Sequence, residues 1–417
     1  MSEGETRALP AEKRAWLEQD PLARLLNVLD ADGEEARVVG GAVRDALIGL
    51  PIGEVDIATT AVPEEVVRRV TRAGFNPVPT GIEHGTVTAV IDGKPFEVTT
   101  LREDIETFGR HAKVRFGRDW KKDALRRDFT INALFLTRAG AVIDFVGGLK
   151  DIEQRRVRFI GDPDTRIRED YLRILRFFRF HAAYGRGLPD ATGLSACIRT
   201  RNELATLSRE RVRAELLKLF LAEHAVPALA AMAEAGLLVS VLGGVPLLAS
   251  FSNLLKAEHA LGFPPDPVRR LAALAVFVAD DAERLRERLR LSNTESRRLE
   301  SMGDRWWQVS PDRGEAVARA LLYRIGAEHF LDRALIAFSR SQAKVDDKGW
   351  RDLLALPGRW TPPKFPLAAK DFTARGIEKG PALGAALERA EEAWIAAGFP
   401  ELRAQVDQIA DEAAAKR

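Results

Sequence analysis

The chain has 417 residues and a single cysteine, Cys197, so it cannot form an intramolecular disulfide. No uninterrupted apolar run approaches the roughly 18 residues that a membrane-spanning helix needs. The first residues are polar and lack the apolar segment of a secretory signal peptide. The six histidines show no metal-ligand spacing. These absences argue against a disulfide-stabilised secreted protein, a membrane protein and a histidine-based zinc site, and we expect a cytoplasmic protein that does not contact a membrane.

Net charge is also small, because 63 lysines and arginines oppose 61 acidic residues and leave a formal charge of +2. This balance does not by itself predict a nucleic-acid-binding protein. Arginine is instead concentrated in four stretches, which contain the segments DALRRDFT, RIREDYLRILRFFRF, LSRERVRAELLKL and RERLRLSNTESRRLE. Taken alone, each stretch indicates no more than a solvated helix face.

The hydrophobic pattern changes along the chain. Between Arg37 and Val146, short β-branched segments alternate with glycine turns, and VIDGKPFEVTT predicts a hairpin that turns at Asp92-Gly93. After Gly147-Gly148, apolar residues recur every three or four positions, which predicts helices. We therefore expect an α+β fold: an N-terminal mixed sheet with helices, followed by an all-α region.

A pair of glycines, Gly40-Gly41, lies between a predicted strand and a predicted helix. Glycines at such a turn let backbone N–H groups approach a phosphate, and the helix N-terminus favours negative charge. Arg44, one turn into the helix, lies within reach of the same phosphate. The simpler interpretation is an ordinary connection between a strand and a helix.

Two carboxylates, Glu54 and Asp56, follow in the segment IGEVDIATT. Residues two apart in a strand point to the same face, where these like charges repel unless a cation lies between them. A third acid, Glu97, occurs in the predicted strand FEVTTLR. Clustered acids near a phosphate-binding turn are typical of Mg²⁺-dependent nucleotidyl transfer, although each acid taken singly also fits a solvent-facing position.

Four motifs occur in the order and approximate spacing of a known family: VVGGAVRDALIGLPIGEVDIATT, HGTVTAVIDGKPFEVTTLRED, RRDFTINALF and EDYLRILRFFRF. The chain thus resembles the class II tRNA nucleotidyltransferases, which are the CCA-adding enzymes of bacteria, and the related bacterial poly(A) polymerases. The resemblance is strong from Arg37 to Tyr184 and looser beyond. It implies a polymerase-β-like nucleotidyltransferase head over residues 1–148, a base-recognising helical neck over 149–230, a helical body over 231–360 and a tRNA-binding tail over 361–417.

The resemblance also implies roles for individual residues. Glu54 and Asp56 match the metal-binding acids, and Glu97 matches an additional acid near the primer's 3′-hydroxyl. Asp128 is expected to fix Arg127 and its loop. The residues expected to contact the triphosphate are Gly41, Arg44 and Arg127. The family usually has aspartate where this chain has Glu54, which reaches one methylene further toward the metal. The segment 103–123 resembles a flexible loop.

The segment EDYLRILRFFRF places Asp170, Arg173, Arg176 and Arg179 three residues apart, which would form one stripe of a helix. A carboxylate accepts hydrogen bonds and a guanidinium donates them, so Asp170 and Arg173 together match the pairing edges of cytosine and adenine. We expect Arg176 and Arg179 near the base or the triphosphate. The alternative is a ladder of ion pairs within the helix, from Glu169 and Asp170 to Arg173.

The function that follows is addition of C, C and A to the tRNA 3′ end from CTP and ATP, with Mg²⁺ as cofactor and no protein partner. A poly(A) polymerase, an enzyme that adds only CC or only A, and a non-catalytic RNA-binding protein are the alternatives. The C-terminal segment has no long basic tail to hold unstructured RNA, which disfavours the poly(A) alternative.

Overall fold

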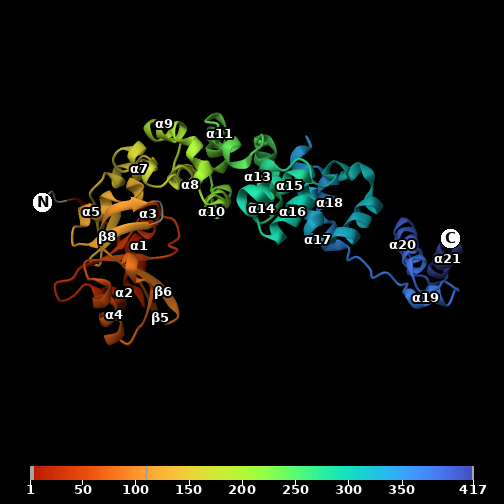
Figure 1. Ribbon diagram of the computed structural model, residues 1–417, viewed down its shortest axis with the longest axis horizontal. Helices are drawn as coiled ribbons and strands as arrows, with labels where there is room; N and C mark the ends of the chain where they lie inside the picture. The colour runs from red at the N-terminus through yellow and green to blue at the C-terminus, as the bar shows by residue number, and fades with distance from the viewer. Residues whose placement is uncertain (1–3, 109–110, 416–417) are drawn as a thin grey trace. The chain divides into compact units, whose positions relative to one another are not determined.

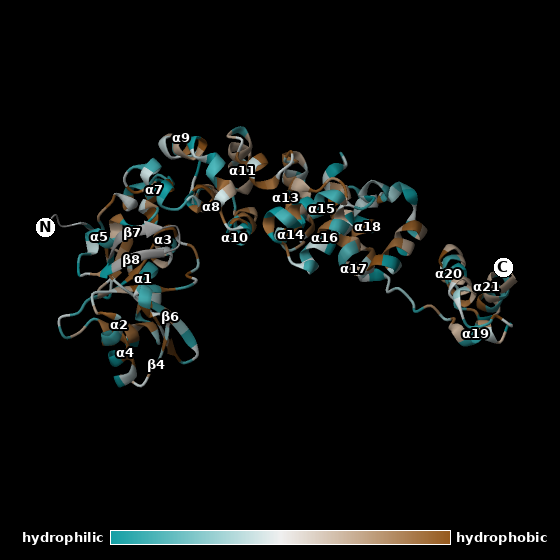
Figure 2. Cartoon of the chain, viewed as in Figure 1, coloured by the Kyte–Doolittle hydropathy of each residue, from teal (hydrophilic) through white to brown (hydrophobic). Residues whose placement is uncertain are grey.

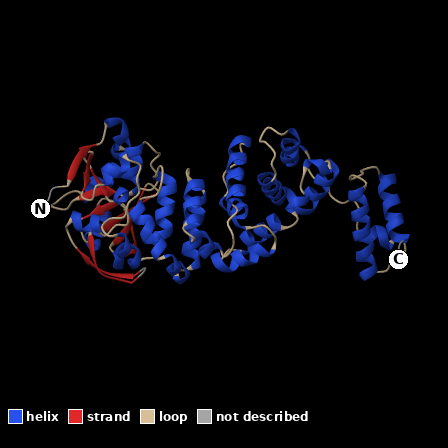
Figure 3. Ribbon diagram, turned by 90° about the horizontal axis from the view of Figure 1, so that it is seen from above, coloured by secondary structure: helices blue, strands red, loops and turns tan. Residues whose placement is uncertain are grey.

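The computed structural model describes residues 4–108 and 111–415, without the side chains of residues 80, 103–108 and 111–114. The chain forms two compact units, Met1–Val245 and Pro246–Arg417 (Figure 1). All strands of the described chain belong to the first unit, and the second contains only helices and their connections (Figure 3). The expected order of a mixed α+β region followed by an all-α region is therefore confirmed. The finer division into four domains stays a prediction, and its boundary at residue 230 falls inside a helix, α11 (Ala225–Glu234).

The first unit is built on a sheet of eight strands in the order β1-β10-β9-β2-β3-β6-β5-β4. The bounds of its strands are β1 Glu5–Ala8, β2 Ala36–Val39, β3 Asp56–Thr59, β4 Asn76–Gly81, β5 Thr86–Ile91, β6 Lys94–Thr100, β9 Leu134–Thr137 and β10 Ala141–Asp144. All neighbours are antiparallel except β3 and β6, which run parallel. The predicted hairpin is β5–β6, and positive φ at both Asp92 and Gly93 gives the turn that suits the twist of two strands.

Two parts of this unit differ from the prediction. The segment expected to be a flexible loop contains two paired strands, β7 (Arg102–Phe108) and β8 (His111–Phe116), followed by the short helix α5 (Trp120–Leu125). Residues 109–110 of that segment lie outside the described residues. In addition, β3 begins at Asp56, so Glu54 lies just before the strand and not within it.

The helices follow the predicted three-to-four residue periodicity. Those of the first unit are α1 Ala11–Arg14, α2 Leu22–Leu29, α3 Gly41–Ile48, α4 Pro63–Arg72, α5, α6 Gly148–Glu153, α7 Pro163–Glu169, α8 Leu172–Tyr184, α9 Ala191–Arg199, α10 Arg209–Phe220, α11 and α12 Leu237–Leu242. Those of the second are α13 Leu248–Leu261, α14 Pro267–Ala275, α15 Asp280–Leu289, α16 Asn293–Gly303, α17 Glu315–Arg340, α18 Lys348–Arg359, α19 Ala369–Thr373, α20 Pro381–Ala396 and α21 Arg403–Ala415. Within the described residues, none of these helices combines the length and apolarity that a membrane crossing requires.

Hydrophobic residues occur in the helices and strands of both units (Figure 2), and buried apolar side chains form clusters in each. One cluster underlies the region of the predicted site and joins β2, β3, α5 and β9 through Val39, Ala58, Ala124 and Phe135, all fully or almost fully buried. Full burial of a side chain such as that of Val39 or Phe135 contributes about 1.5–3 kcal/mol. The cluster therefore fixes the strand ends from which the candidate site residues project.

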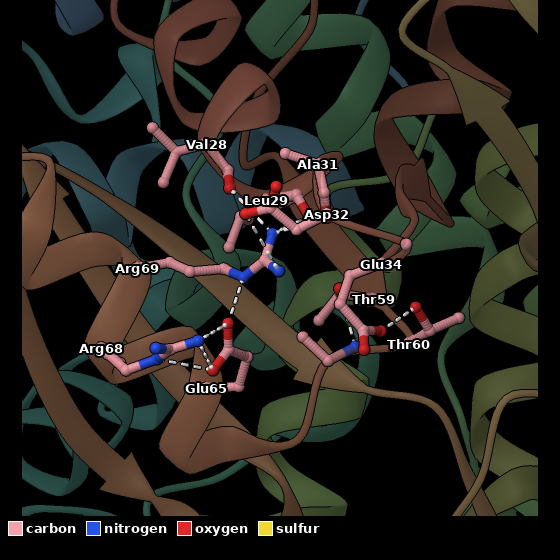
Figure 4. A network of polar contacts seen from close by, with 12 residues as sticks. Val28, Leu29, Ala31, Asp32, Glu34, Thr59, Thr60, Glu65, Arg68 and Arg69 are labelled. Carbon is pink, nitrogen blue, oxygen red and sulfur yellow. Dashed lines mark hydrogen bonds and ion pairs between the residues drawn. The ribbon is translucent and has the colours of Figure 1, made fainter.

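A polar network holds the C-terminal end of β3, at Thr59, away from Asp56 at its start (Figure 4). Thr59 Oγ1 donates to the carbonyl oxygen of Glu35 at 2.8 Å, and Thr60 Oγ1 donates to Glu34 Oε2 at 2.5 Å. Arg69 of α4 donates to the carbonyl oxygen of Ala31 at 2.8 Å, just after α2, and its Nε donates to Glu65 at 2.5 Å. The network ties the connection between α2 and β2 to the end of β3, so that both strands are held in register.

Candidate active site

The glycine pair forms the turn between β2 and α3. Gly40 is the residue before the helix, with φ 74° and ψ −124°, a conformation that residues with a Cβ rarely adopt. A Cβ at Gly40 would lie 3.9 Å from Nη1 of Arg127 and 3.8 Å from the carbonyl oxygen of Asn132. Arg127 and Asn132 therefore lie beside the start of α3, where free N–H groups favour an anion.

The three predicted acids converge beside this turn. Asp56 pairs with Val39 of β2 on one side and with Glu97 of β6 on the other, so the carboxylates of Asp56 and Glu97 start from neighbouring positions of two parallel strands. Glu54 precedes β3 by two residues, and all three acids are exposed. Asp56 is thus placed between the glycine turn and Glu97.

The pKa of Asp56 is raised above its ordinary value. Partial desolvation raises it most, the negative charges of Glu97 and Glu54 raise it further, and Arg127 opposes them. A bound cation would relieve this repulsion. The described residues contain no cluster of three or more histidine, cysteine, aspartate or glutamate side chains that could hold a metal on their own. Mg²⁺ typically takes one or two carboxylates together with waters and substrate phosphates, so Glu54 and Asp56 have suitable chemistry without a third ligand.

Arg127 is held by an acid that the sequence analysis missed. Asp123 of α5 is 1% exposed and accepts from Nε and Nη2 of Arg127 at 3.2 and 3.0 Å and from Nε of Arg126 at 2.7 Å. Burial favours the neutral acid, but the two arginines outweigh it and lower the pKa of Asp123. Because Nε and Nη2 of Arg127 bind Asp123, the remaining nitrogen, Nη1, is the one that faces Gly40. The four-residue spacing of Asp123 and Arg127 was the available signal, although Arg127 lies two residues after the end of α5.

Asp128 has a different partner from the one expected. It does not bind Arg127: its Oδ2 accepts from Arg176 of α8 at 2.7 Å and its Oδ1 from the backbone N–H of Phe129 at 2.9 Å. Burial would raise its pKa, but the Arg176 guanidinium beside it keeps the pKa below its usual range. Asp128 therefore remains ionised and links the sheet region to α8. The expectation that it fixes Arg127 is wrong, because Asp123 occupies that role.

Arg44 is 6% exposed, which is unusual for a predicted phosphate ligand. Its Nε donates to Asp45 at 2.9 Å, its Nη1 to Asn132 at 2.6 Å and its Nη2 to Tyr184 at 2.7 Å. Gly41 is adjacent, since a Cβ there would lie 3.5 Å from Nη2 of Arg44. The guanidinium is thus fixed beside the first residue of α3. A guanidinium carries five N–H donors, so two remain beyond these three bonds.

The segment expected to be one helix is broken at Asp170. Helix α7 ends at Glu169, Asp170 is extended with φ −156° and ψ 107°, and α8 begins at Leu172. Asp170 therefore does not continue the helical stripe of Arg173, Arg176 and Arg179, and that part of the prediction is wrong. The break is stabilised locally, because Oδ1 of Asp170 accepts from the backbone N–H of Leu172 at 3.1 Å.

The two predicted base readers are neighbours with different partners. Asp170 Oδ2 accepts from Nη2 of Arg211 of α10 at 2.6 Å, a contact that the sequence analysis missed. Arg173 forms an ion pair with Glu169 and donates to the carbonyl oxygen of Arg166 at 2.7 Å. Of the predicted ladder, the pair of Glu169 with Arg173 is present, although it joins α7 to α8 across the break. Asp170 and Arg173 are joined through the backbone, where the N–H of Arg173 donates to the carbonyl oxygen of Asp170 at 3.0 Å.

Arg176 and Arg179 continue the stripe on α8 and are partly buried. Both face Glu215 of α10, at 3.9 Å from Nη1 of Arg176 and 2.6 Å from Nε of Arg179. Both guanidinium groups also lie over the ring of Phe180, at 5.3 and 4.2 Å from its centroid. Arg211 and Glu215 are four residues apart in RERVRAE, a spacing that places both on one face of a helix. This spacing was the sequence signal by which the two contact residues of α10 could have been found.

Comparison with known proteins gives a consistent assignment. Residues 36–158 match the family model described as the poly A polymerase head domain, and residues 192–251 match that of the probable RNA and SrmB-binding site of polymerase A. The mitochondrial CCA tRNA nucleotidyltransferase 1 of Mus musculus is 35% identical over 386 residues, which cover 91% of this chain and 87% of the mouse protein. The CCA-adding enzyme of Limosilactobacillus fermentum is 33% identical over 395 residues, which cover 89% and 91%.

Solved structures agree with these relatives. The crystal structure of the Bacillus stearothermophilus CCA-adding enzyme in complex with CTP aligns with a TM-score of 0.74 and 27% identity, covering 94% of this chain and 98% of that one. The Thermotoga maritima CCA-adding enzyme, complexed with tRNA, aligns with a TM-score of 0.68 at 19% identity and covers 100% and 99%. At 19% identity, the likeness to the Thermotoga maritima enzyme shows a shared fold only.

Proposed function

Because the chain belongs to the family of tRNA nucleotidyltransferases and poly(A) polymerases, we propose that it adds C, C and A to the 3′ end of tRNA from CTP and ATP. Pyrophosphate leaves at each step. The observation that carries the proposal is the extent of the match to CCA-adding relatives: it runs through nine-tenths of the chain, and so includes the helical regions beyond the shared head.

Glu54 and Asp56 are proposed to hold Mg²⁺, with the remaining positions taken by water and by the nucleotide. When bound, the ion supplies a Lewis acid that favours the ionised form of the attacking hydroxyl and offsets charge on the phosphates. Glu97 lies next to Asp56 across the parallel pair of strands and is proposed to face the primer's 3′-hydroxyl. The 3′-oxygen bonds to the α-phosphorus while the bond from that phosphorus to the bridging oxygen breaks.

The triphosphate is proposed to bind at the start of α3. The N–H of Gly41, the Nη1 of Arg127 and the buried guanidinium of Arg44 are arranged around Gly40 and Gly41. These donors are held in place before the nucleotide arrives, by Asp123 for Arg127 and by Asn132 for Arg44. Preorganised donors of this kind stabilise charge without a reorganisation cost at the moment of reaction.

Base selection is proposed for Asp170 and Arg173, with Arg176 and Arg179 behind them. Cytosine and adenine each present an amino donor beside a ring-nitrogen acceptor, whereas uracil and guanine reverse this pattern. An aspartate accepts from the amino group and an arginine donates to the ring nitrogen. The protein itself then acts as the template, and the helical region binds duplex tRNA mainly through its shape and backbone.

The test is a product-length assay on a tRNA that lacks its CCA end, with CTP alone, ATP alone or both. We expect two added residues with CTP, and three with both nucleotides. Long A-tracts with ATP alone would replace the proposal with poly(A) synthesis. Extension that stops at CC in the presence of both nucleotides would indicate a CC-adding enzyme. No extension in any mixture would favour a binding protein without catalysis.

We further propose that the reaction takes place in the cytoplasm, because a chain with the single cysteine Cys197 has no disulfide framework, as is usual in a reducing compartment. The mouse and human relatives are named as mitochondrial proteins. Fractionation of cells that produce the protein would test this assignment, and co-purification with another compartment would contradict it.

A further inference from the structure

The buried guanidinium of Arg44 connects two helices that are far apart in the sequence. Arg44 lies on α3, in the first turn after the glycine pair, and its Nη2 donates to the hydroxyl of Tyr184 at 2.7 Å. Tyr184 is the last residue of α8. We propose that Tyr184 is a positioning residue, which holds Arg44 against the nucleotide triphosphate; this inference rests on the proposed function.

The contact is made by the ring as well as by the hydroxyl. The Arg44 guanidinium carbon lies 3.7 Å from the centroid of the Tyr184 ring, well within the range of a cation–π interaction, which is strongest when the groups are desolvated. Desolvation by burial raises the pKa of the Tyr184 hydroxyl, so the hydroxyl stays neutral and its oxygen accepts from Arg44. Two independent interactions therefore fix one guanidinium plane.

Tyr184 binds the part of Arg44 that lies beside the proposed phosphate site. The atom that Tyr184 binds, Nη2 of Arg44, is also the atom that lies 3.5 Å from the place of a Cβ on Gly41. Nη1 is held from the other side by Asn132 at 2.6 Å. Tyr184 and Asn132 thus set the guanidinium beside the first N–H groups of α3, where the triphosphate is proposed to bind.

Charged groups surround Arg44 on this side of the site. Three guanidinium groups approach the ring of Phe180, from Arg44 at 5.6 Å, Arg176 at 5.3 Å and Arg179 at 4.2 Å. Each has an acidic partner, which is Asp45 for Arg44, Asp128 for Arg176 and Glu215 for Arg179. Asp45 binds Nε of Arg44, so Tyr184 orients the far end of the guanidinium through Nη2.

The proposal predicts a specific kinetic effect. Because Arg44 is proposed to contact the triphosphate, which CTP and ATP share, loss of the Tyr184 contact should weaken both nucleotides equally. A change confined to the base readers would instead alter the preference between bases. The structure therefore assigns to Tyr184 an effect on nucleotide KM that is independent of the base.

The experiment compares Tyr184→Phe and Tyr184→Leu with Tyr323→Phe as the matched control. Tyr323 lies in the second unit, and its hydroxyl donates to Glu391, so Tyr323→Phe also removes a hydroxyl that binds a charged group. Single-nucleotide addition is measured on full-length protein with tRNA primers that accept C or A, and thermal unfolding is followed in parallel.

We expect Tyr184→Phe to raise the KM for CTP and ATP by a common factor of about five, with kcat nearly unchanged, because the ring contact remains. Tyr184→Leu removes both contacts and should lower kcat/KM by more than about 30-fold for both nucleotides. Tyr323→Phe should match the wild type. Wild-type KM values in both Tyr184 variants, or an increase for only one nucleotide, would overturn the inference. Failure of the wild-type protein to add CCA would instead overturn the proposed function.

Discussion

At the scale of single residues, the site depends on which acid holds which cation. Asp123 fixes Arg127 and Asp128 fixes Arg176, although the two acids are only five residues apart. No ion pair joins Glu54 or Asp56 to an arginine or lysine of the described residues. Desolvation raises the pKa of Asp56 most, Glu97 and Glu54 raise it further, and Arg127 lowers it. Within the site, the two acids expected to bind Mg²⁺ thus keep their charge available for a cation.

Substitution of Glu54 tests this assignment. Glu54→Ala removes a proposed metal ligand and should lower nucleotide addition by more than about 100-fold, since metal-assisted charge stabilisation accounts for several kcal/mol. Glu54→Asp restores the carboxylate on a shorter side chain and should retain most activity. Both are measured as the rate of C addition over a range of Mg²⁺ concentrations, and full activity of Glu54→Ala would exclude the metal role.

At the scale of elements, the start of α3 and the break between α7 and α8 are the two local structures on which the chemistry depends. The first requires glycine at Gly40, whose φ of 74° strains any other residue. The second requires a partner from α10, because Asp170 lies outside both helices and its Oδ2 is held by Arg211.

Gly40→Ala should impair nucleotide binding beyond its cost in stability. The added Cβ is strained by about 1–2 kcal/mol and lies 3.9 Å from Nη1 of Arg127. Gly49→Ala is the matched control, because Gly49 ends the same helix with φ 76° and has nothing within 4 Å of its Cβ position. We expect the larger loss of melting temperature in Gly40→Ala, because its ψ of −124° lies outside the left-handed helical region that Gly49 adopts with ψ 26°. We expect a higher KM for CTP only in Gly40→Ala. Equal KM values would show that the turn contributes strain alone.

Arg211→Gln should reduce base selection. Without the 2.6 Å contact from Arg211, the Asp170 carboxylate loses its fixed orientation, and discrimination of CTP from UTP should fall about ten-fold, the equivalent of one charged hydrogen bond. Arg199→Gln is the control, because it removes an exposed ion pair between α9 and Asp164 of α7 without touching Asp170. Competition between CTP and UTP in single additions measures the ratio. Unchanged discrimination would show that Arg211 does not orient Asp170.

At the scale of the whole molecule, the chain divides into two units, each with its own core. The site residues all belong to the first unit. The second unit contains a buried charge network of its own, in which Arg298 of α16 binds Asp332 of α17 at 2.5 Å and Asp266, just before α14, at 2.9 Å. Asp332 is 1% exposed and also lies 3.7 Å from Nη1 of Arg269, so its charge depends on these two arginines.

Calorimetry should therefore separate the two units. CTP with Mg²⁺ should raise the unfolding temperature of the first unit, because a ligand stabilises the form that binds it. Arg298→Met should leave the buried Asp332 with only its longer ion pair, to Arg269 at 3.7 Å, and destabilise the second unit by about 3 kcal/mol. Arg286→Met is the control, since its ion pair with Glu283 is exposed and worth little. A single transition that responds to both changes would contradict independent units.

Much of this protein can be predicted from local patterns in its sequence. The hairpin at Asp92-Gly93, the glycine turn at Gly40-Gly41 and the order of Glu54, Asp56 and Glu97 along the chain need only residue type and spacing. The change to helices after Gly148 is equally local, because it depends on apolar residues that recur every three or four positions. The family follows from the same motifs.

The tertiary structure decided which partners these residues have. Arg44 binds Tyr184 across 140 positions, Arg176 binds Asp128 across 48 and Arg211 binds Asp170 across 41. The sequence offers many acids and arginines of equal chemistry, and only the packing of α3, α8 and α10 brings particular ones within hydrogen-bond distance. The break at Asp170 arises in the same way, because its extended backbone is held by Leu172 and Arg211 once the helices are packed.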